Sequence, residues 1–558
     1  MLMNDDAAAF ASAAARGMYL AHWAARMPSA TALIGSQGKL TFAELNARAN
    51  RLAHALRARG VQSGDALAML CHNGFELVEV VMATRRIGVR LTPINYQLGA
   101  EEVAYILQDC DAKVFIANAR FAAAAAPAAR ACGSLALRIA ADGVIEGFER
   151  LRDLVSGQPE HDVSDPVLGV NMLYTSGSTG KPKGVERTSA PPISPARIPF
   201  EAGRSLCLCT GPLYHAAPLA FSLIAPLLGG AGVVLMDGWD PERSLQLIEE
   251  HCITHTHMVP TMFHRLLGLP REVRDEFDLS SLEYVLHGAA PCPVPLKRAL
   301  IEWLGPVVFE YYGATEGLGT IVDTETWLRK PGTVGKPDPS DQICILDDAG
   351  ERLPARESGL VYLKAPDGLR FRYYKDSGKT QAAFRGDYFT LGDVGYLDED
   401  GYLFLTDRSA NLIISGGVNI YPAEVDAVLL THPAVQDVAV IGVPNAEWGE
   451  EVKAAVELRR GIEASDALAK ELIDYCRSHL AHYKCPRSVD FFEELPRRDT
   501  GKLSKYALRE QYRRAALDKR GSTHDTTAGQ FSGRASDLAR RFGARIVVWS
   551  AVSHAGRR

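Results

Sequence analysis

The chain of 558 residues is too long for one hydrophobic core, so its length predicts roughly two to four domains. Its 61 basic and 67 acidic residues give a net charge of −6, which argues against a basic surface for nucleic acid. The ten cysteines are scattered without a C-x-x-C pair, which excludes a short disulfide framework and fits the reducing cytoplasm, where we expect the protein to be located.

The N-terminus lacks the basic and then apolar order of a secretory signal, because Asp5 and Asp6 precede an Ala-rich stretch. The longest stretch without charged residues or histidine, Ala216–Met236, is interrupted by Pro218 and Pro226. It predicts a buried helix, a turn and a buried strand, not a transmembrane segment. The sequence leaves open contact with a membrane surface and the oligomeric state.

The N-terminal part of the chain alternates helical and strand patterns. Thr41 and Glu44 have the spacing of a capping box at the start of a helix. Ala66–Cys71 and Val114–Ala117 are typical of buried strands between helices, as in a parallel sheet. A second region of this kind covers about residues 205–321. In it, the cysteines of Cys207-x-Cys209 alternate with apolar residues and are predicted to be core residues, not metal ligands.

The segment Tyr174–Val185, between these two regions, follows an apolar run of strand length. It contains small hydroxylated residues, three glycines and two lysines. Because glycine allows close approach of the backbone and lysine supplies positive charge, this loop predicts a polyphosphate site more strongly than a polar surface turn. It is not a Walker A loop, since Gly177 and Gly180 have the wrong spacing and Pro182 stands where a magnesium-binding hydroxyl would be.

From about residue 332 the pattern changes to short strands and turns. Ile343–Gly350 and Val394–Leu405 each place Asp and Gly between apolar strands, as hairpins require. A helix at 422–430, a strand at 435–443 and a helix at 467–479 follow. We therefore expect an α/β protein with the following parts: a large N-terminal domain (1–409) of parallel βα sheets with a small β-barrel-like subdomain, a small α+β C-terminal domain (410–518), and a poorly ordered tail (519–558).

Five further segments fit the loop at Tyr174–Val185, and they occur in this order: Pro212-Leu-Tyr-His215, His287-Gly-Ala-Ala-Pro291, Tyr311-Tyr-Gly-Ala-Thr-Glu316, Thr390-Leu-Gly-Asp393 with Asp407-Arg408, and Pro496-Arg-Arg-Asp-Thr-Gly-Lys502. Taken together, the six segments resemble the adenylate-forming superfamily, which includes acyl-CoA synthetases, peptide-synthetase adenylation domains and firefly-type luciferases. The resemblance covers roughly residues 18–515.

The resemblance implies an enzyme that joins a carboxylic acid to AMP, releases pyrophosphate and then transfers the acyl group to CoA. ATP, Mg²⁺ and CoA would be required, and the partners would be small molecules. A carboxylate is a poor electrophile, whereas an acyl-adenylate has a phosphate monoester as its leaving group. Forming it requires a phosphate cradle, a divalent ion and a cation near the developing negative charge.

The resemblance also implies roles for individual residues. Glu316 would hold Mg²⁺, Thr315 would contact the α-phosphate, and His215 would lie near the carboxylate end of the acyl pocket. With Lys502, the residues Thr175, Glu316 and His215 would form the catalytic set. The phosphates would be bound by the loop residues Thr175, Ser176, Gly177, Ser178, Thr179, Gly180 and Lys183. The adenosine would be bound by Gly288, Ala289, Ala290, Tyr312, Gly313, Asp393 and Arg408.

Lys502 ends the pattern Pro-Arg-x-x-x-Gly-Lys, and its ammonium group would stabilise charge on the pentavalent phosphorus. In the family, the small domain is mobile and rotates after pyrophosphate leaves. Its hinge matches Ala410, where relatives usually carry Asp or Lys. Gly416 and Gly417 would let pantetheine pass along a bare backbone, and Lys484 would contact CoA.

The candidate walls of the acid pocket are Met258–Phe263, Val285–His287 and Gly313–Thr320, which are mostly apolar and contain no Arg or Lys for a second carboxylate. We expect a medium- or long-chain fatty acid, with a steroid- or bile-acid-like or other cyclic acid as an alternative. A second alternative is an adenylating enzyme that loads a carrier protein. A third is a non-catalytic nucleotide- or acyl-binding protein, which the presence of Lys502 and Glu316 disfavours.

Overall fold

The structure of the protein, a computed structural model, describes residues 2–175, 182–187, 198–347, 349–365, 370–408, 411–415, 418–445, 448–497 and 503–521. Contacts within the chain divide it into two compact units. The N-terminal unit comprises Met1–Ile343 and Leu363–Leu391, and the C-terminal unit comprises Cys344–Tyr362 and Gly392–Arg558. The predicted boundary at 409/410 remains a prediction, and most of the predicted tail lies outside the described residues.

One sheet of the N-terminal unit has five parallel strands in the order β4-β3-β5-β6-β7. These strands are β3 (Ala66–Leu70), β4 (Arg90–Pro93), β5 (Ala112–Ala117), β6 (Leu137–Ala140) and β7 (Glu149–Arg150). Val114 and Ile116 of β5 join one core cluster, whereas Phe115 and Ala117 join another, because successive side chains of a strand point to opposite faces. The two strands predicted in this region are therefore confirmed.

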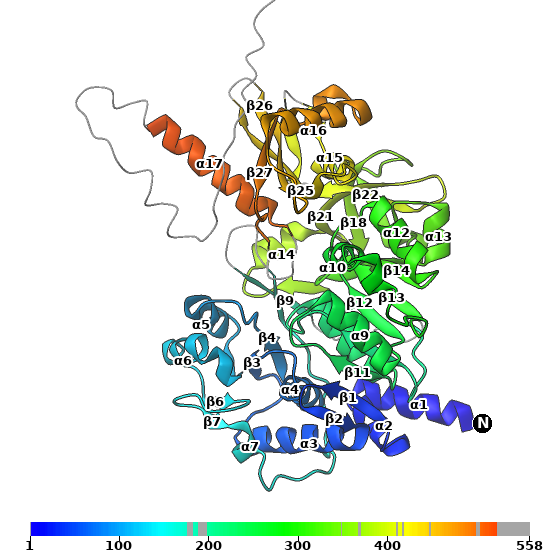
Figure 1. The fold of residues 1–558 in the computed structure, drawn as a ribbon. Helices are drawn as coiled ribbons and strands as arrows, with labels where there is room; N and C mark the ends of the chain where they lie inside the picture. The colour runs from blue at the N-terminus through cyan, green and yellow to red at the C-terminus, as the bar shows by residue number, and fades with distance from the viewer. Residues whose placement is uncertain are drawn as a thin grey trace, which may run out of the picture. The chain divides into compact units, whose positions relative to one another are not determined.

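Along the chain, α4, α5 and α6 lie between successive strands of this sheet (Figure 1). Thr41 caps α3, since its side chain accepts a hydrogen bond from the Glu44 backbone and Glu44 bonds back to Thr41 N at 2.8 Å. The predicted capping box is thus confirmed. The helices are α1 (Leu2–Ala15), α2 (Tyr19–Arg26), α3 (Phe42–Ala58), α4 (Phe75–Arg86), α5 (Ala100–Asp109), α6 (Ala122–Ala131) and α7 (Leu151–Leu154).

A second sheet of this unit has eight strands in the order β15-β14-β13-β12-β10-β11-β1-β2, with antiparallel pairs only at its two edges. The strands are β1 (Thr31–Gly35), β2 (Gly38–Thr41), β10 (Leu206–Cys209), β11 (Gly232–Leu235), β12 (His255–Met258), β13 (Tyr284–Gly288), β14 (Val308–Ala314) and β15 (Gly317–Val322). Both cysteines of β10 are buried with free thiols, as predicted for core residues.

The helices around the second sheet include a π-helix, η3 (Pro218–Ile224), followed by α8 (Ala225–Leu228) and then β11. The stretch Ala216–Met236 is therefore a buried helical segment, a turn and a buried strand, as predicted. No helix among the described residues is both long and apolar enough to cross a membrane. The remaining helices are α9 (Pro241–His251), α10 (Pro260–Leu267), α11 (Arg271–Arg274), α12 (Val294–Leu304), α13 (Thr324–Arg329) and α14 (Ser377–Ala383).

A small antiparallel sheet holds the ends of the predicted phosphate loop. Its strands are β8 (Leu173–Thr175), β9 (Lys183–Arg187) and β19 (Phe371–Tyr373), in the order β19-β9-β8. Thr175 and Lys183 are paired across β8 and β9, so both ends of the loop are fixed by the sheet. Glu186 of β9 is buried and bonds to Arg90 at 3.0 Å and to Arg372 of β19.

The C-terminal unit begins at Cys344 and contains most of the antiparallel hairpin of β21 (Tyr388–Leu397) and β22 (Leu403–Arg408), which confirms the hairpin predicted there. Its second sheet has the order β24-β23-β26-β25, with β27 beside β26. The elements are β23 (Ile413–Ser415), β24 (Val418–Ile420), β25 (Val435–Asn445), β26 (Gly449–Leu458), β27 (Ser488–Phe492), α15 (Pro422–Leu429), α16 (Asp466–His479) and α17 (Lys505–Gly521). The predicted fold class is confirmed: parallel α/β sheets and a smaller α+β C-terminal part.

Candidate functional site

Thr315 and Glu316 form the two-residue turn of the β14–β15 hairpin, because Ala314 pairs directly with Gly317. A Cβ atom at residue 317 would lie 2.6 Å from the Phe389 ring, so only glycine fits at the end of this turn. Arg187 holds the backbone of Thr315. Its Nε donates to the Thr315 carbonyl oxygen at 3.1 Å, and its Nη2 donates to the same atom. The hairpin therefore presents Glu316 at a fixed tip.

Tyr373 connects Glu316 to the sheet that holds the phosphate loop. Its hydroxyl donates to Glu316 Oε1 at 3.0 Å, and its ring centroid lies 5.4 Å from Lys183 Nζ. Burial and the neighbouring Glu316 charge raise the pKa of the Tyr373 phenol well above its usual range, so the hydroxyl remains a donor at neutral pH. Sequence analysis missed Tyr373, because no local pattern predicts that β19 pairs with β9.

A second lysine lies beside the predicted phosphate residue Lys183. Burial, followed by the positive charge of Lys379, lowers the pKa of Lys183, whereas Asp376 opposes this shift. Lys379 is itself paired with Asp376 at 3.0 Å in the first turn of α14. The positive charges of Lys183 and Lys379 therefore repel each other, and a bound polyphosphate would offset this repulsion. Lys379 was also missed by sequence analysis.

The segment predicted to contact adenine follows β13, beside the strand that carries Tyr312. Gly288 pairs with Tyr311, and a Cβ atom at residue 288 would lie 2.5 Å from the Tyr311 carbonyl oxygen. Ala289 has φ = 64°, a left-handed conformation that is uncommon outside glycine. The structure therefore brings residues 288–290 and 312–313 together at neighbouring strand ends. Their role in binding adenine remains a prediction.

His215 follows the turn at the end of β10, immediately before the helical segment of η3. The turn is held by Asn73, a buried residue that sequence analysis missed. Asn73 Nδ2 donates to Gly211 O and to the Met236 carbonyl at 3.0 Å each, and Leu213 N donates to its Oδ1 at 2.9 Å. The three hydrogen bonds fix the backbone from which His215 projects.

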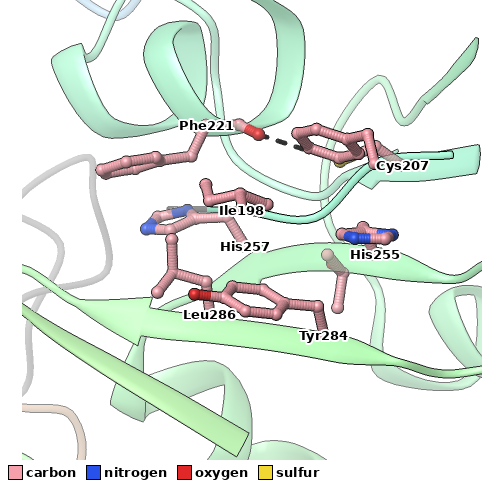
Figure 2. A pocket seen from close by; sticks show the side chains of 9 residues that line it. Ile198, Cys207, Phe221, His255, His257, Tyr284 and Leu286 are labelled. Atoms are coloured by element: carbon pink, nitrogen blue, oxygen red, sulfur yellow. Dashed lines mark hydrogen bonds between the residues drawn. The ribbon is translucent and has the colours of Figure 1, made fainter. Parts of the chain in front are cut away.

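A small cavity of about 10 Å³, the space that one water molecule requires, lies on one face of the second sheet. The rings of Phe221, His257 and Tyr284 and the side chain of Leu286 face this space (Figure 2). The Phe221 ring lies 4.8 Å from that of Tyr311, whose hydroxyl lies 3.3 Å from His257 Nε2. The nine lining residues are Ile198, Phe200, Cys207, Phe221, His255, Thr256, His257, Tyr284 and Leu286.

The cavity differs from the predicted walls for a geometric reason. Side chains alternate along β13, so Tyr284 and Leu286 face the cavity, whereas Val285 joins the core cluster with Phe263 on the opposite face. His287 packs edge-on against Phe263 with ring centroids 5.2 Å apart. Of the predicted wall Val285–His287, only Leu286 lines this cavity, and the assignment of that wall to the acid pocket remains a prediction.

Lys297, Glu310 and His287 form a buried cluster of polar side chains, and His287 immediately precedes residues 288–290. Lys297 Nζ lies 2.7 Å from Glu310 Oε2, and His287 Nε2 lies 3.7 Å from the same oxygen. Neither ring nitrogen of His287 has a hydrogen-bond partner within the described part of the chain. Burial, followed by the charge of Lys297, lowers the pKa of His287 well below its usual range, so the imidazole is neutral.

In the C-terminal unit, Asp393 of β21 pairs in register with Arg408 of β22, so the two predicted ribose-side residues occupy opposite positions of one hairpin. Lys484, predicted to contact CoA, donates to both carboxylate oxygens of Glu424 at 2.8 Å each. The remaining predicted residues lie outside the described residues: Ser176, Gly177, Ser178, Thr179, Gly180, Ala410, Gly416, Gly417 and Lys502.

Comparison with known proteins agrees with the order of these segments. Residues 20–374 match the protein family described as AMP-binding enzyme, and residues 424–502 match the AMP-binding enzyme C-terminal domain. A feruloyl-CoA synthase of an Amycolatopsis species is 36% identical over 495 residues, covering 88% of this chain and 97% of that protein.

Two further proteins differ in their acids. A long-chain-fatty-acid–CoA ligase of Mycobacterium tuberculosis is 34% identical, covering 85% of this chain and 93% of that protein. The crystal structure of an anthranilate CoA ligase in complex with anthranoyl-AMP is similar with a TM-score of 0.80 and 28% identity, covering 89% of this chain and 98% of that one.

Proposed function

Because the chain belongs to the AMP-binding enzyme family and is an AMP-forming acid–thiol ligase, we propose that its acid substrate is apolar and carries a planar ring. The observation that carries this proposal is that two relatives, the feruloyl-CoA synthase and the anthranilate CoA ligase, are named for aryl acids. The cavity of Figure 2, which Phe221 and Tyr284 line, has the space of about one water molecule, so it can receive an aryl ring only if its side chains move. The lining residues include neither Arg nor Lys, so a second carboxylate on the substrate would lack a partner.

A medium- or long-chain fatty acid is the second candidate, since the similar ligase of Mycobacterium tuberculosis takes long-chain fatty acids. The similarity to the feruloyl-CoA synthase and the anthranilate CoA ligase supports an acid with a planar ring instead. A steroid-like acid would also bring rings, but it would be bulky and saturated. In this proposal the two relatives named for aryl acids rank an aryl acid ahead of both.

The enzyme is ATP-dependent, forms an adenylate and uses CoA. In the first step, a carboxylate oxygen of the acid bonds to the α-phosphorus of ATP, and the bond to pyrophosphate breaks. In the second step, the CoA thiol loses its proton, sulfur bonds to the acyl carbon, and AMP leaves. We assign Lys183 and Lys379 to the phosphates that become pyrophosphate, because Lys183 stands at one end of the predicted phosphate loop and the charge of Lys379 acts on it.

The residues present fit a magnesium ion. Mg²⁺ in nucleotide sites uses one or two carboxylates together with substrate phosphates and water, so the single carboxylate of Glu316 is a suitable donor. The described residues contain no group of three His, Cys, Asp or Glu side chains that would form an all-protein metal cage. When bound, Mg²⁺ would neutralise phosphate charge.

We keep the roles that the sequence predicted for the C-terminal residues as part of the proposal. Asp393 and Arg408 would bind the ribose, and Lys502 would stabilise the transition state of adenylation. Gly416, Gly417 and Lys484 would serve the CoA step, with Ala410 at the hinge. A reducing compartment such as the cytoplasm suits the ten free cysteines.

The test is a substrate panel with ATP, Mg²⁺ and CoA, in which AMP release gives kcat/KM and mass spectrometry identifies the thioester. Cinnamate, a hydroxycinnamate and indole-3-acetate should exceed octanoate and palmitate by about tenfold or more, which corresponds to ~1.4 kcal/mol of transition-state binding. A higher kcat/KM for octanoate or palmitate would refute the proposal that the acid carries a planar ring, but not the ligase activity. If AMP were released only when a carrier protein is present, the acyl acceptor would be that carrier protein and not CoA.

A matched variant separates the two half-reactions. Lys502→Ala should lose adenylate formation while thioester formation from supplied acyl-adenylate continues, because its charge is required only at phosphorus. Equal loss of both half-reactions would contradict the role assigned to this lysine.

A further inference from the structure

The carboxylate of Glu316 requires support from outside its own hairpin. It stands at the tip of a two-residue turn, and the side chain of a glutamate has three rotatable bonds that a turn of this length does not restrain. The printed partner of the carboxylate is the hydroxyl of Tyr373, which donates to Oε1 at 3.0 Å. The second oxygen, Oε2, does not take part in that hydrogen bond.

Tyr373 is itself held by a different part of the chain. It is the last residue of β19, where it pairs with Val185 of β9, and its backbone N–H donates to Thr380 Oγ1 at 3.0 Å. Its ring packs edge-on against Phe371, with centroids 5.3 Å apart. The same ring lies beneath the ammonium group of Lys183. The donor is therefore fixed by the sheet that also fixes both ends of the phosphate loop.

We infer that Tyr373 is the positioning residue for the metal-binding carboxylate of Glu316. Its hydrogen bond occupies Oε1, restricts the rotation of the carboxylate and leaves Oε2 for the magnesium of Mg·ATP. This inference rests on the proposed function, because it requires that Glu316 binds the ion. Hydrogen-bond partners of metal ligands orient those ligands, and their loss typically costs about 10- to 100-fold in metal affinity.

The geometry also implies how phosphate and metal binding are coupled. Tyr373 contacts Glu316 through its hydroxyl and Lys183 through its ring face. One side chain therefore lies between the proposed metal ligand and the proposed phosphate-binding cation. Removing only the hydroxyl should weaken metal binding while the cation–π contact with Lys183 remains. A general loss of packing would instead affect nucleotide binding with and without metal.

The experiment compares Tyr373→Phe with Tyr374→Phe in the full-length chain. Tyr374 is a suitable control because its hydroxyl bonds to Asp111 at 2.6 Å and to Arg90 at 3.2 Å instead of to Glu316. Binding of Mn²⁺ in the presence of α,β-methylene-ATP is followed by electron paramagnetic resonance, and AMP release is titrated with Mg²⁺. Melting temperatures confirm that both variants are folded.

We expect Tyr373→Phe to weaken Mn²⁺ binding about tenfold or more, with AMP release restored by excess Mg²⁺, and Tyr374→Phe to resemble the wild type. In a Glu316→Gln background, Tyr373→Phe should have no further effect on Mn²⁺ binding. Unchanged Mn²⁺ affinity in Tyr373→Phe, or an additive loss in the double variant, would overturn the inference and leave the ligase intact. A wild-type protein that releases no AMP with any acid would overturn the proposed function and this inference with it.

Discussion

The buried ion pair of Lys297 and Glu310 allows a quantitative test of the packing behind residues 288–290. The two charged atoms lie 2.7 Å apart, Lys297 is completely buried and Glu310 is 6% exposed. At an effective dielectric constant of about 20, unit charges at this distance attract by about 6 kcal/mol, but transferring the ions from water costs several kcal/mol each. We therefore expect the pair to contribute little net stability, whereas one ion without its partner is costly.

Lys297→Met leaves the Glu310 carboxylate buried without its cation, and we expect a loss of about 3–5 kcal/mol in the free energy of unfolding. Replacing both residues, as Lys297→Met with Glu310→Leu, should recover most of this loss. Lys364→Met is the control, because its pair with Asp341 is 2.5 Å long but 40% and 49% exposed, and its loss should remain below about 1 kcal/mol.

Urea unfolding followed by tryptophan fluorescence is the assay, since the ring of Trp327 lies 4.6 Å from Lys297 Nζ and reports on this region. Burial raises the pKa of Glu310, and the charge of Lys297 opposes that shift. Without Lys297 the pKa of the folded state rises further above that of the unfolded state. The variant should thus be most stable below the unfolded pKa of about 4.3 and lose stability as pH rises through the folded pKa.

Two results would refute this reasoning about the buried pair. One is a loss for Lys297→Met no larger than that for Lys364→Met. The other is a deficit of Lys297→Met that does not change with pH, because a carboxylate left alone must take up a proton as the pH falls.

Two further predictions concern His255 and Asn73. Burial lowers the pKa of His255 to about 4, so the unfolded state alone gains this proton as pH falls from about 6.5, and stability should drop by up to about 3 kcal/mol by pH 4. His255→Gln should flatten this part of the pH–stability curve, and an unchanged slope would contradict the assignment. Asn73→Ala leaves Leu213 N–H and two carbonyls without their side-chain partner, which should cost about 2–4 kcal/mol in thermal unfolding. A loss below about 1 kcal/mol would show that water replaces the amide.

The sequence predicted those parts of the fold that depend on residues close to one another along the chain. Thr41 and Glu44 are three residues apart, so their capping box is visible in the sequence. Within Ala216–Met236, Pro218 and Pro226 stand in the first turns of η3 and α8, and the turn at Gly229–Gly230 separates this helical segment from β11. The Asp and Gly residues between β21 and β22 mark their hairpin. Each of these features depends on residues within a short segment of the sequence.

The site was predictable only where a contiguous motif carries it. The motif that ends in Glu316 forms one hairpin turn, so the sequence alone locates it. Tyr373 and Lys379 reach the same region through the pairing of β9 with β19, which joins segments far apart in the sequence. The Asn73 side-chain amide bonds to backbone atoms of Gly211 and Leu213, and backbone partners leave no trace in the composition of the turn. Tertiary pairing, not local propensity, determines these three positions.

The alternation along β13 also bears on how related enzymes can diverge. Tyr284 and Leu286 face the cavity, while Val285 belongs to the core on the other side of the same strand. Tyr284 and Leu286 are themselves buried in a smaller core cluster with Tyr311, so a mutation at either position changes the packing of that face and leaves the cluster of Val285 in place. The two faces of the strand can therefore diverge separately among relatives, each at its own cost in packing.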